Sequence, residues 1–455
     1  MVMALSPMAT VAREMSDPED DRIQALLADW VDGRHQSRGV SAAAIEQDRI
    51  RFHSHGVMGL QDKREISQDS VFGIASLTKV FTGLLLTDAV LRKEVALADP
   101  VRPYLPTNTK VPNYHGREIT LLDLAMHTTG LPQEIPNYTE AAANIGSDPN
   151  APLFKLLESL ELTRPIGEAW SYSNLNYALI GIALSHRAGM SYESLIVRRI
   201  ANPLQLKDTR VTATHGMASR RASPHLDYDT PAPEWNKPWS LGAGGLQSTG
   251  QDLAHFLNHA VNGVSSPLQE AFAAMLRTTH PAPFLEGDQA IGWAIDRNHG
   301  DPRVFFGGRA PGFTSSMMFD PKARRGAVVL SNSALMVESL GREILRPGST
   351  ASSSSPQTNF ASDPALDRLV GRYTLDEPHG DAHFAAGEIV EISRTANGLA
   401  VSMPRYPSTS LMRLGEGVFG IEGFSVRYEF APGPGPAASL SLTINGKTVV
   451  ATRTK

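Results

Sequence analysis

The sequence predicts an α+β domain, with one mixed antiparallel sheet beside a helical lobe, followed by a small antiparallel β-barrel. Three observations lead to this prediction. The 455 residues exceed the roughly 250–300 residues at which a single hydrophobic core stops growing, so at least two domains are expected. Strand patterns begin and end the first part of the chain, with helix patterns between them. Beyond a Ser-rich stretch, only strand patterns occur.

The first expected elements are a helix and two strands. Residues 18–30 predict a helix because Asp17 can cap it, Pro18 suits the first helical position, and the apolar residues share one face. Residues 40–45 and 50–57 predict two strands joined by a tight turn. Residues 76–91 predict a helix whose apolar side chains surround it, so we expect that helix to be buried on most sides.

The middle of the first domain is predicted to be helical, with helices at 119–126 and 177–188. Gly242–Gly250 is expected to be a Gly-rich loop, and Asp252 is expected to cap a helix that ends near Val261. Strands are then expected at 291–296, 304–306, 315–319 and 326–331. Because early and late strands flank helices, we expect both ends of the domain to complete one sheet.

The composition changes at Pro347–Pro364, where a Ser-rich run carries too few apolar residues to order itself and predicts a linker. Asn397-Gly398 and Asn445-Gly446 are strong hairpin turns in the region that follows. That region contains eight expected strands, at 369–375, 388–394, 399–403, 408–414, 418–421, 426–430, 440–444 and 448–452. The predicted domains are therefore residues 1–346 and 365–455, joined by a linker at 347–364.

Composition also argues against several classes of function. The net charge of −5 gives no reason to expect nucleic acid as a partner. Cys is absent and no His-Glu-x-x-His spacing occurs, so we expect no metal and no cofactor. No stretch approaches the roughly 18–20 apolar residues of a membrane span. Met1–Glu14 lacks the pattern of a secretory signal, so a cytoplasmic location is expected, and a periplasmic or secreted location stays open if the start of the sequence was altered. The oligomeric state is not indicated.

Ser76 and Lys79 form the first chemical motif. On a helix they lie one turn apart and share a face, and the N-terminal end of a helix favours developing negative charge. A Ser hydroxyl is a weak nucleophile that needs a base, and a Lys becomes that base when burial lowers its pKa. Taken alone, the pair is more often a helix-start Ser and a solvated Lys.

Two further motifs contain residues suited to the same chemistry. Tyr172 can transfer a proton, and Asn174 offers an amide donor and acceptor to a substrate. In the run Phe306-Gly307-Gly308-Arg309, the glycines leave room for a ligand, and a backbone N–H there can complete an oxyanion hole with that of Ser76. Each motif also has a structural explanation, either a core Tyr with a turn-forming Asn or a bulged strand. His127 is expected to be structural.

In this order, the three motifs resemble the signatures of class-C β-lactamases and their relatives, among them D-aminopeptidases, D,D-peptidases and family VIII esterases. Ile119–Pro132, Gly242–Leu253 and Pro311–Ser316 resemble further segments of that family. Some relatives carry a C-terminal lipocalin-like barrel, which fits residues 365–455. The resemblance implies a β-lactamase-like serine hydrolase. Its site would consist of Ser76, Lys79 and Tyr172 as catalytic residues, and Asn174, Phe306, Gly307, Gly308 and Arg309 as substrate-binding or oxyanion residues.

One departure from the family concerns the third motif. Phe306-Gly307-Gly308 stands where β-lactamases have Lys-Thr-Gly and many relatives have His-x-Gly. Loss of that cation is expected to weaken the binding of a substrate carboxylate by about 1.5–3 kcal/mol. The aromatic residue resembles the Trp-x-Gly variant of some family VIII esterases. Arg309 is a candidate for restoring the charge, although a solvated surface Arg is the simpler interpretation.

Several functions remain open on this basis. Phe306 favours an esterase or transacylase, whereas the added barrel favours a hydrolase of D-amino-acid amides or peptides. A penicillin-binding-protein-type thioesterase that cyclises or releases a peptide has the same two-domain plan. β-Lactamase activity is least favoured because the cation is missing. A non-catalytic acyl sensor, acylated once without turnover, is the alternative outside the enzymes. In each case the partner is a small-molecule or peptide acyl group.

Overall fold

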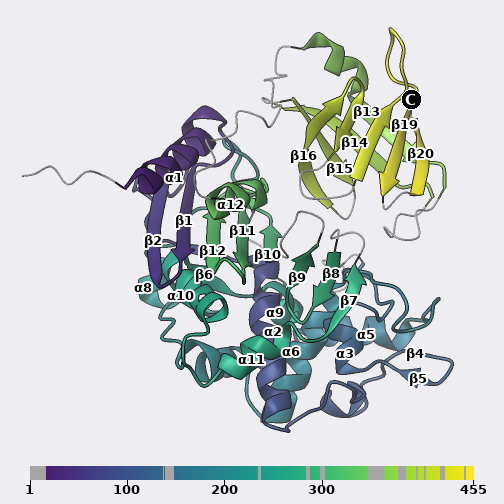
Figure 1. The fold of residues 1–455 in the computed structure, drawn as a ribbon. Helices are drawn as coiled ribbons and strands as arrows, with labels where there is room; N and C mark the ends of the chain where they lie inside the picture. Colours follow the sequence, from purple (N-terminus) through teal and green to yellow (C-terminus); the bar gives the residue numbers. More distant parts are fainter. Residues whose placement is uncertain are drawn as a thin grey trace, which may run out of the picture.

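The computed structural model of the chain describes residues 17–136, 138, 148–233, 237–282, 287–297, 303–346, 363–377, 386–395, 398–403, 406–420, 426–444 and 447–454. An α+β body with one large sheet is followed by a closed antiparallel barrel (Figure 1), so the predicted fold class is confirmed. The predicted linker falls outside the described residues, except for Asp363 and Pro364. Among the described helices, none is long and apolar enough to cross a lipid bilayer.

The large sheet joins the early strands of the chain to its late strands. Its order is β2-β1-β12-β11-β10-β9-β8-β7, and each neighbouring pair is antiparallel. The pairing of β1 with β12 sets Val40 opposite Ser331, which brings the N-terminal hairpin beside the last strand of the sheet. The bounds are β1 Gly39–Glu46, β2 Arg49–Gly56, β7 Thr279–Ala282, β8 Gly287–Ala290, β9 Ala294–Asp296, β10 Arg303–Ala310, β11 Phe313–Asp320 and β12 Arg325–Ser331.

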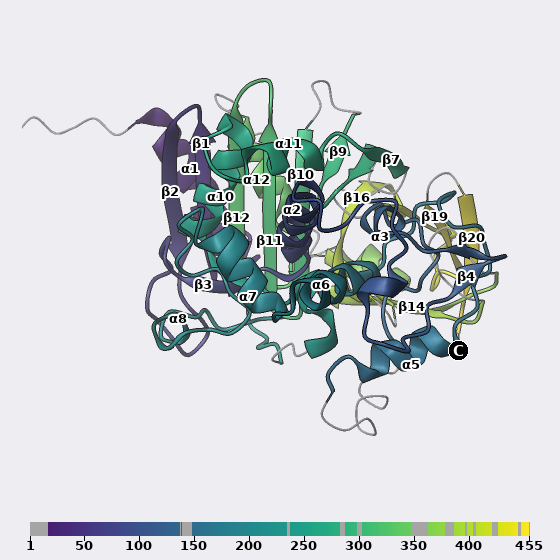
Figure 2. The ribbon, with the colours of Figure 1, turned by 90° about the horizontal axis from the view of Figure 1, so that it is seen from below.

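Helices cover both faces of this sheet. Alternate residues of each strand point to opposite faces, so Val328 and Leu330 join the main core, whereas Ala327 and Val329 join a smaller core with α1 and α12. Figure 2 shows α2 directly beside β10 and β11, with α6 next to it. The helices are α1 Pro18–Ala28, α2 Thr78–Leu91, α3 Leu121–Ala125, α5 Ala151–Ser159, α6 Asn174–Ala188, α7 Tyr192–Ile196, α8 His215–Ala218, α9 Leu241–Gly244, α10 Gly250–Asn262, α11 Gln269–Met275 and α12 Glu338–Leu345.

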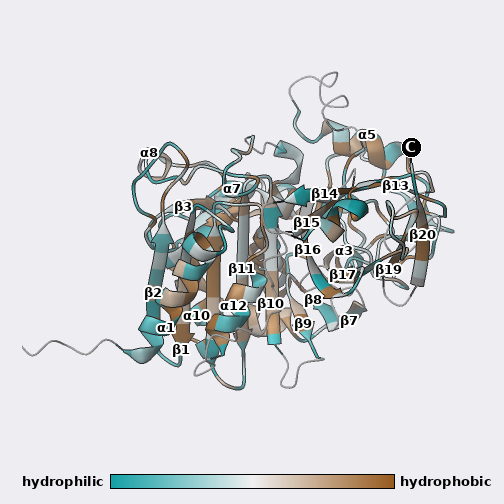
Figure 3. Ribbon diagram, turned by 90° about the horizontal axis from the view of Figure 1, so that it is seen from above, coloured by the Kyte–Doolittle hydropathy of each residue, from teal (hydrophilic) through white to brown (hydrophobic). Residues whose placement is uncertain are grey.

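The burial of α2 follows from its sequence. Twelve of its fourteen residues are buried, from Thr78 to Ala89, as its widely spread apolar residues predicted. Apolar residues line the central strands and the helices beside them (Figure 3). Helix α2 begins where the sheet and the helical lobe meet. The short strand β3 (Val71–Gly73) precedes it and pairs with β6 (Gln247–Thr249).

Two details around the Gly-rich segment differ from the prediction. Gly242–Gly250 is not a continuous loop, because it contains most of α9 and all of β6. Thr249, not Asp252, caps α10, because its side chain accepts a hydrogen bond from the Asp252 N–H. The Asp252 carboxylate instead accepts hydrogen bonds from the backbone N–H groups of Lys207 and Asp208, and so ties that loop to the start of α10.

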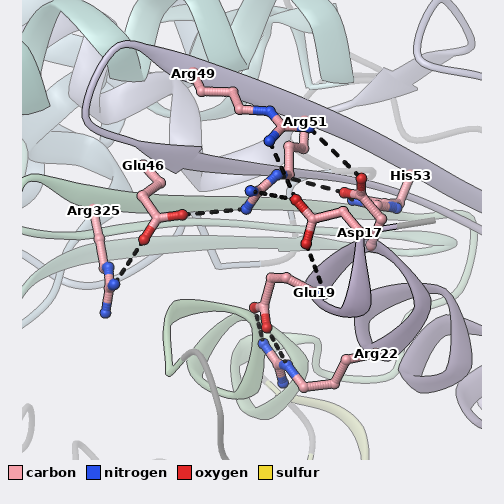
Figure 4. A network of polar contacts seen from close by, with 9 residues as sticks. Asp17, Glu19, Arg22, Glu46, Arg49, Arg51, His53 and Arg325 are labelled. Carbon is pink, nitrogen blue, oxygen red and sulfur yellow. Dashed lines mark hydrogen bonds and ion pairs between the residues drawn. The ribbon is translucent and has the colours of Figure 1, made fainter. Parts of the chain in front are cut away.

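A polar network fastens α1 to the edge of the sheet (Figure 4). The guanidinium of Arg51 on β2 lies 2.8 Å from the Asp17 carboxylate, at the N-terminal end of α1, and 3.2 Å from that of Glu46. Arg325 on β12 contacts the other Glu46 oxygen at 2.7 Å. This hydrogen bond from Arg325, with support from Arg51, lowers the pKa of Glu46. The network therefore links α1, β1, β2 and β12 through charges that stay ionised at neutral pH.

The C-terminal strands close into a barrel because β13 pairs with both β14 and β20. Its interior is filled by buried side chains, among them Tyr373, Phe419 and Leu442. The expected turn residues Asn397, Asn445 and Gly446 lie outside the described residues. The strands are β13 Gly371–Leu375, β14 Ile389–Thr395, β15 Gly398–Met403, β16 Tyr406–Gly415, β17 Val418–Gly420, β18 Val426–Phe430, β19 Ser439–Ile444 and β20 Lys447–Arg453.

Candidate active site

Ser76 lies in a strained turn at the start of α2. A single 3₁₀ turn, Ala75–Leu77, precedes the helix, and Ala75 has φ 46°, a left-handed conformation that costs free energy for a residue with a Cβ. Leu246, the residue before β6, anchors the turn, because the Ile74 N–H donates to the Leu246 carbonyl and the Leu246 N–H donates to the Thr78 hydroxyl. The turn leaves Ser76 partly exposed while its neighbours are buried.

Lys79 is fully buried one helical turn from Ser76, and its Nζ has three polar neighbours. These are the Ser76 Oγ at 3.1 Å, the Asn174 Oδ1 at 2.7 Å and the Ala243 carbonyl at 2.7 Å. Burial lowers the pKa of Lys79 from 10.5 to about 7, although the nearby charge of Glu134 opposes that shift. A substantial fraction of this amine is therefore neutral at physiological pH.

The hydroxyl of Tyr172 donates a hydrogen bond to the Ser76 Oγ at 2.8 Å. Burial raises the pKa of this phenol far above its ordinary value, so the hydroxyl stays protonated in the resting site. The Lys79 Nζ also lies 4.9 Å from the centre of the Tyr172 ring. The predicted residues Ser76, Lys79 and Tyr172 are thus brought together in one cluster, although 96 positions separate Ser76 from Tyr172.

His127 holds the Tyr172 loop in place. Its carbonyl accepts a hydrogen bond from the Ser171 N–H at 2.7 Å, and its Nδ1 accepts one from the Ser173 N–H at 3.1 Å. The ring also packs against Tyr172, with 4.8 Å between ring centres. Burial and the charge of Lys79 hold the pKa of His127 well below 6.5, so the ring is neutral. This placement agrees with the structural role expected for His127.

Glu134 and Lys237 complete the polar cluster, and neither residue was predicted from the sequence. The Glu134 carboxylate accepts hydrogen bonds from the Asn174 Nδ2 at 2.6 Å and from the Lys237 Nζ at 3.0 Å. The contact with Asn174 turns the Asn174 Oδ1 toward Lys79. Glu134 lies two positions after Pro132, the end of the family-like segment, so its position offered a signal, whereas Lys237 lies in a distant loop.

Strand β10 places the four residues of the third motif on opposite faces of the sheet. Phe306 and Gly308 face the main core, and Gly308 lies so close to the nucleophile turn that a Cβ there would come within 2.2 Å of the Ile74 carbonyl oxygen. Phe306 itself is buried in that core. Gly307 and Arg309 face α12, where a Cβ on Gly307 would meet the Glu338 carboxylate.

Because its side chain points toward α12, Arg309 does not restore the cation that is missing at Phe306. Burial lowers the pKa of Arg309 to about 10, and the charge of Glu338 opposes that shift. The backbone N–H of Arg309 remains the candidate contact for a substrate oxygen, next to Gly308. No group of three or more His, Cys, Asp or Glu side chains in the described part of the chain is arranged to hold a metal ion.

Comparison with known proteins agrees with this geometry. The family model described as Beta-lactamase matches residues 20–347. The chain is 30% identical over 253 residues to the D-alanyl-D-alanine-carboxypeptidase/endopeptidase AmpH of Escherichia coli, a match that covers 54% of this chain and 63% of that protein. It is 28% identical over 303 residues to Protein flp of Staphylococcus aureus, covering 65% and 59% respectively. The matches therefore span about three fifths of these relatives.

Two solved structures share the fold. A beta-lactamase/D-alanine carboxypeptidase from Yersinia pestis superposes with a TM-score of 0.61 at 24% identity, covering 72% of this chain and 99% of that one. A protein of the same description from Pseudomonas syringae gives 0.64 at 19% identity, covering 73% and 99%. With the family model matching most of the chain and the same architecture seen in solved structures, this chain belongs to the beta-lactamase family of serine hydrolases.

Proposed function

We propose that the chain is an acyl-transferring serine hydrolase, in which Ser76 attacks the carbonyl of an ester or amide and forms an acyl-enzyme. The observation that carries this proposal is the position of the Ser76 Oγ, 3.1 Å from the buried amine of Lys79 and 2.8 Å from the phenol of the partly buried Tyr172. A hydroxyl between a base and an acid is the arrangement that nucleophilic catalysis requires. If Ser76 were only a structural residue and Lys79 only a solvated one, the Ser76 hydroxyl would not need an amine and a phenol beside it.

Lys79 acts as the base in this scheme. A neutral amine has two N–H bonds and one lone pair, and its N–H groups are directed to the Asn174 Oδ1 and the Ala243 carbonyl, which can only accept. The lone pair then faces the Ser76 hydroxyl. The Ser76 proton moves to the Lys79 Nζ as the Oγ forms its bond to the carbonyl carbon.

Tyr172 is the final proton donor to the leaving group. Its raised pKa keeps the phenol protonated until the tetrahedral intermediate collapses, and Lys79 holds the proton that Ser76 lost. Breakage of the bond to the leaving group transfers one proton from the Lys79–Tyr172 pair to that group. A water molecule, amine or alcohol then gives its proton to the same pair as it attacks the acyl-enzyme, and Ser76 regains its proton when the ester bond breaks.

Backbone N–H groups stabilise the oxyanion. The N–H of Ser76 belongs to the first turn of a helix, where donors lack intrahelical partners. The N–H of Arg309 follows Gly308, which packs against that turn closely enough that no larger residue fits. The two donors therefore come from the 3₁₀ turn before α2 and from β10, which approach each other closely at Gly308.

The substrate is an ester or an amide, and two observations bear on the choice. The E. coli relative is described as a D-alanyl-D-alanine-carboxypeptidase/endopeptidase, which favours hydrolysis of a D-amino-acid amide or peptide. Phe306, which replaces the cation of the Lys-Thr-Gly motif, favours a neutral ester instead. β-Lactamase activity remains the least favoured.

Kinetics on matched substrates test the proposal. Wild-type enzyme and Ser76→Ala are compared on a neutral chromogenic ester, a D-amino-acid amide and a D-alanyl-D-alanine peptide, each followed through burst and steady state. We expect a burst and continued turnover with at least one substrate in the wild type and neither in Ser76→Ala. Turnover retained by Ser76→Ala would refute the mechanism, and a burst without turnover would favour the acyl sensor.

A further inference from the structure

A cavity of about 310 Å³ begins beside the candidate nucleophile. Its lining includes Ala75, the residue before Ser76, and Ala310, the residue after Arg309. The two residues that supply the proposed oxyanion donors therefore each have a neighbour in the wall of the cavity. A carbonyl held by these donors would extend one of its substituents into this space. The volume lies at the lower end of the range for small-molecule sites, which is roughly 300–1,000 Å³.

The position of Tyr172 indicates which substituent enters. The group that leaves must lie beside Tyr172, because the proposed mechanism requires the Tyr172 hydroxyl to protonate it. Neither Tyr172 nor Asn174 is among the described residues that line the cavity; the walls come from the segment before Ser76, the end of β10 with Phe313, residues 237–247, and the loop residues Val211, Arg221 and Pro224. The substituent in the cavity is thus on the acyl side of the scissile bond, the part that remains attached to Ser76.

Two cationic side chains contribute to the wall, and they come from separate loops. Arg221 places its guanidinium carbon 5.7 Å from the centre of the Phe313 ring, which lines the same cavity. Lys237 lines the cavity with 28% of its side chain exposed and contacts Glu134 at 3.0 Å. No Asp or Glu is found in this wall among the residues that the structure describes. The remaining lining is mostly Gly, Pro and apolar residues, so positive charge dominates its polar chemistry.

We infer that this cavity binds an anionic group, such as a carboxylate, on the acyl side of the substrate, with Arg221 and Lys237 as its recognition residues. The inference rests on the proposed function and narrows its substrate class. Guanidinium and ammonium groups form charge-assisted hydrogen bonds with carboxylates, and these are stronger than bonds between neutral groups. This site is separate from the position of Phe306, where the sequence lacks a cation, and it recognises the opposite end of the substrate from a leaving-group carboxylate.

Two aryl esters with the same leaving group test the inference. One carries a terminal carboxylate on a glutaryl-length acyl chain, and the other carries the uncharged carboxamide in its place. We expect the wild type to prefer the carboxylate in kcat/KM by about tenfold or more, which corresponds to one charge-assisted contact. We expect Arg221→Gln and Lys237→Met each to reduce this ratio several-fold, with the double variant approaching a ratio of one. Lys110→Met, at an exposed lysine, should leave the ratio unchanged.

The ratio separates the two claims, because a folding defect or a loss of catalysis slows both esters together. A wild-type ratio near one, with both esters hydrolysed, would overturn the inference and leave the proposed function standing. A ratio retained in the double variant would overturn it as well. Absence of turnover and of a Ser76 adduct with either ester would instead refute the proposed function. If Lys237→Met is too unstable to assay, Lys237→Gln, alone and together with Arg221→Gln, provides the same comparison.

Discussion

Replacing Glu134 by Gln removes one negative charge from the active site and leaves the shape of the side chain nearly unchanged. The amide oxygen of the variant can still accept the hydrogen bond from the Asn174 Nδ2, so the geometry at Lys79 is expected to persist. The carboxylate raises the pKa of Lys79 against the larger, opposing effect of burial, and the balance is about 7. Without the carboxylate, the pKa of Lys79 should fall further.

The size of the shift follows from the contacts. One amide group separates Glu134 from Lys79, and at an effective dielectric constant of about 20 a carboxylate at that separation stabilises an ammonium by about 2–3 kcal/mol. The ammonium of Lys237, 3.0 Å from the same carboxylate, cancels part of this field. We therefore expect the pKa of Lys79 to fall by about one unit, equivalent to about 1.4 kcal/mol.

The pH dependence of kcat/KM measures this shift. Only the neutral amine accepts the Ser76 proton, so activity rises with pH through the pKa of Lys79, and the rising limb near pH 7 should move to lower pH in Glu134→Gln. Substrate loss is quantified by chromatography, because the chromatographic signal does not itself change with pH. Glu118→Gln, which removes a surface carboxylate paired with Arg102, is the matched control and should not move the limb. A limb that stays in place or moves to higher pH in Glu134→Gln would refute this reasoning.

Three further predictions concern the acid, the oxyanion strand and the N-terminal network. Tyr172→Phe should lower kcat by about a hundredfold or more, with the largest loss on substrates with poor leaving groups; equal losses on good and poor leaving groups would contradict its role as acid. Gly308→Ala should slow the burst by about a hundredfold, because the added Cβ would displace the turn that carries Ser76. Gly435→Ala, whose Cβ would meet nothing within 4 Å, should leave the burst rate unchanged. Equal burst rates in the two variants would contradict the close packing of Gly308 against the turn. Arg51→Met should lower the midpoint temperature of thermal unfolding by about 2–4 °C, and the exposed Arg64→Met should lower it by less. A larger decrease for Arg64→Met than for Arg51→Met would contradict a stabilising role of the polar network around Arg51.

The sequence predicted the elements whose signals are local. The hairpin at the N terminus, the buried helix after Ser76 and the strands of the barrel follow from period and turn residues, and the structure confirms the fold class. The short strands β7 and β8 and helix α12 were not predicted. Strands β7 and β8 have four residues each, too few to establish a strand period, and they extend the large sheet beyond β9 as consecutive hairpins.

The site shows the same division between local and long-range information. The spacing of Ser76 and Lys79 predicted that the two side chains share a helix face, and the motif order suggested Tyr172 as their partner. Glu134 and Lys237 were missed because their pairing joins positions 103 residues apart in sequence. The direction of the Arg309 side chain was also beyond prediction, since it depends on which face of β10 packs against α12, and only the paired sheet determines that face.

Mass spectrometry of enzyme quenched during turnover tests the central claim most directly, because it asks which atom carries the acyl group. A slowly hydrolysed ester is mixed with wild-type enzyme, the intact mass is recorded, and peptide mapping locates the added acyl group. The mechanism predicts one acyl group per chain, bound to the side chain of Ser76, formed far more slowly in Lys79→Ala. An adduct on another residue, or hydrolysis with no covalent adduct at any time, would contradict it.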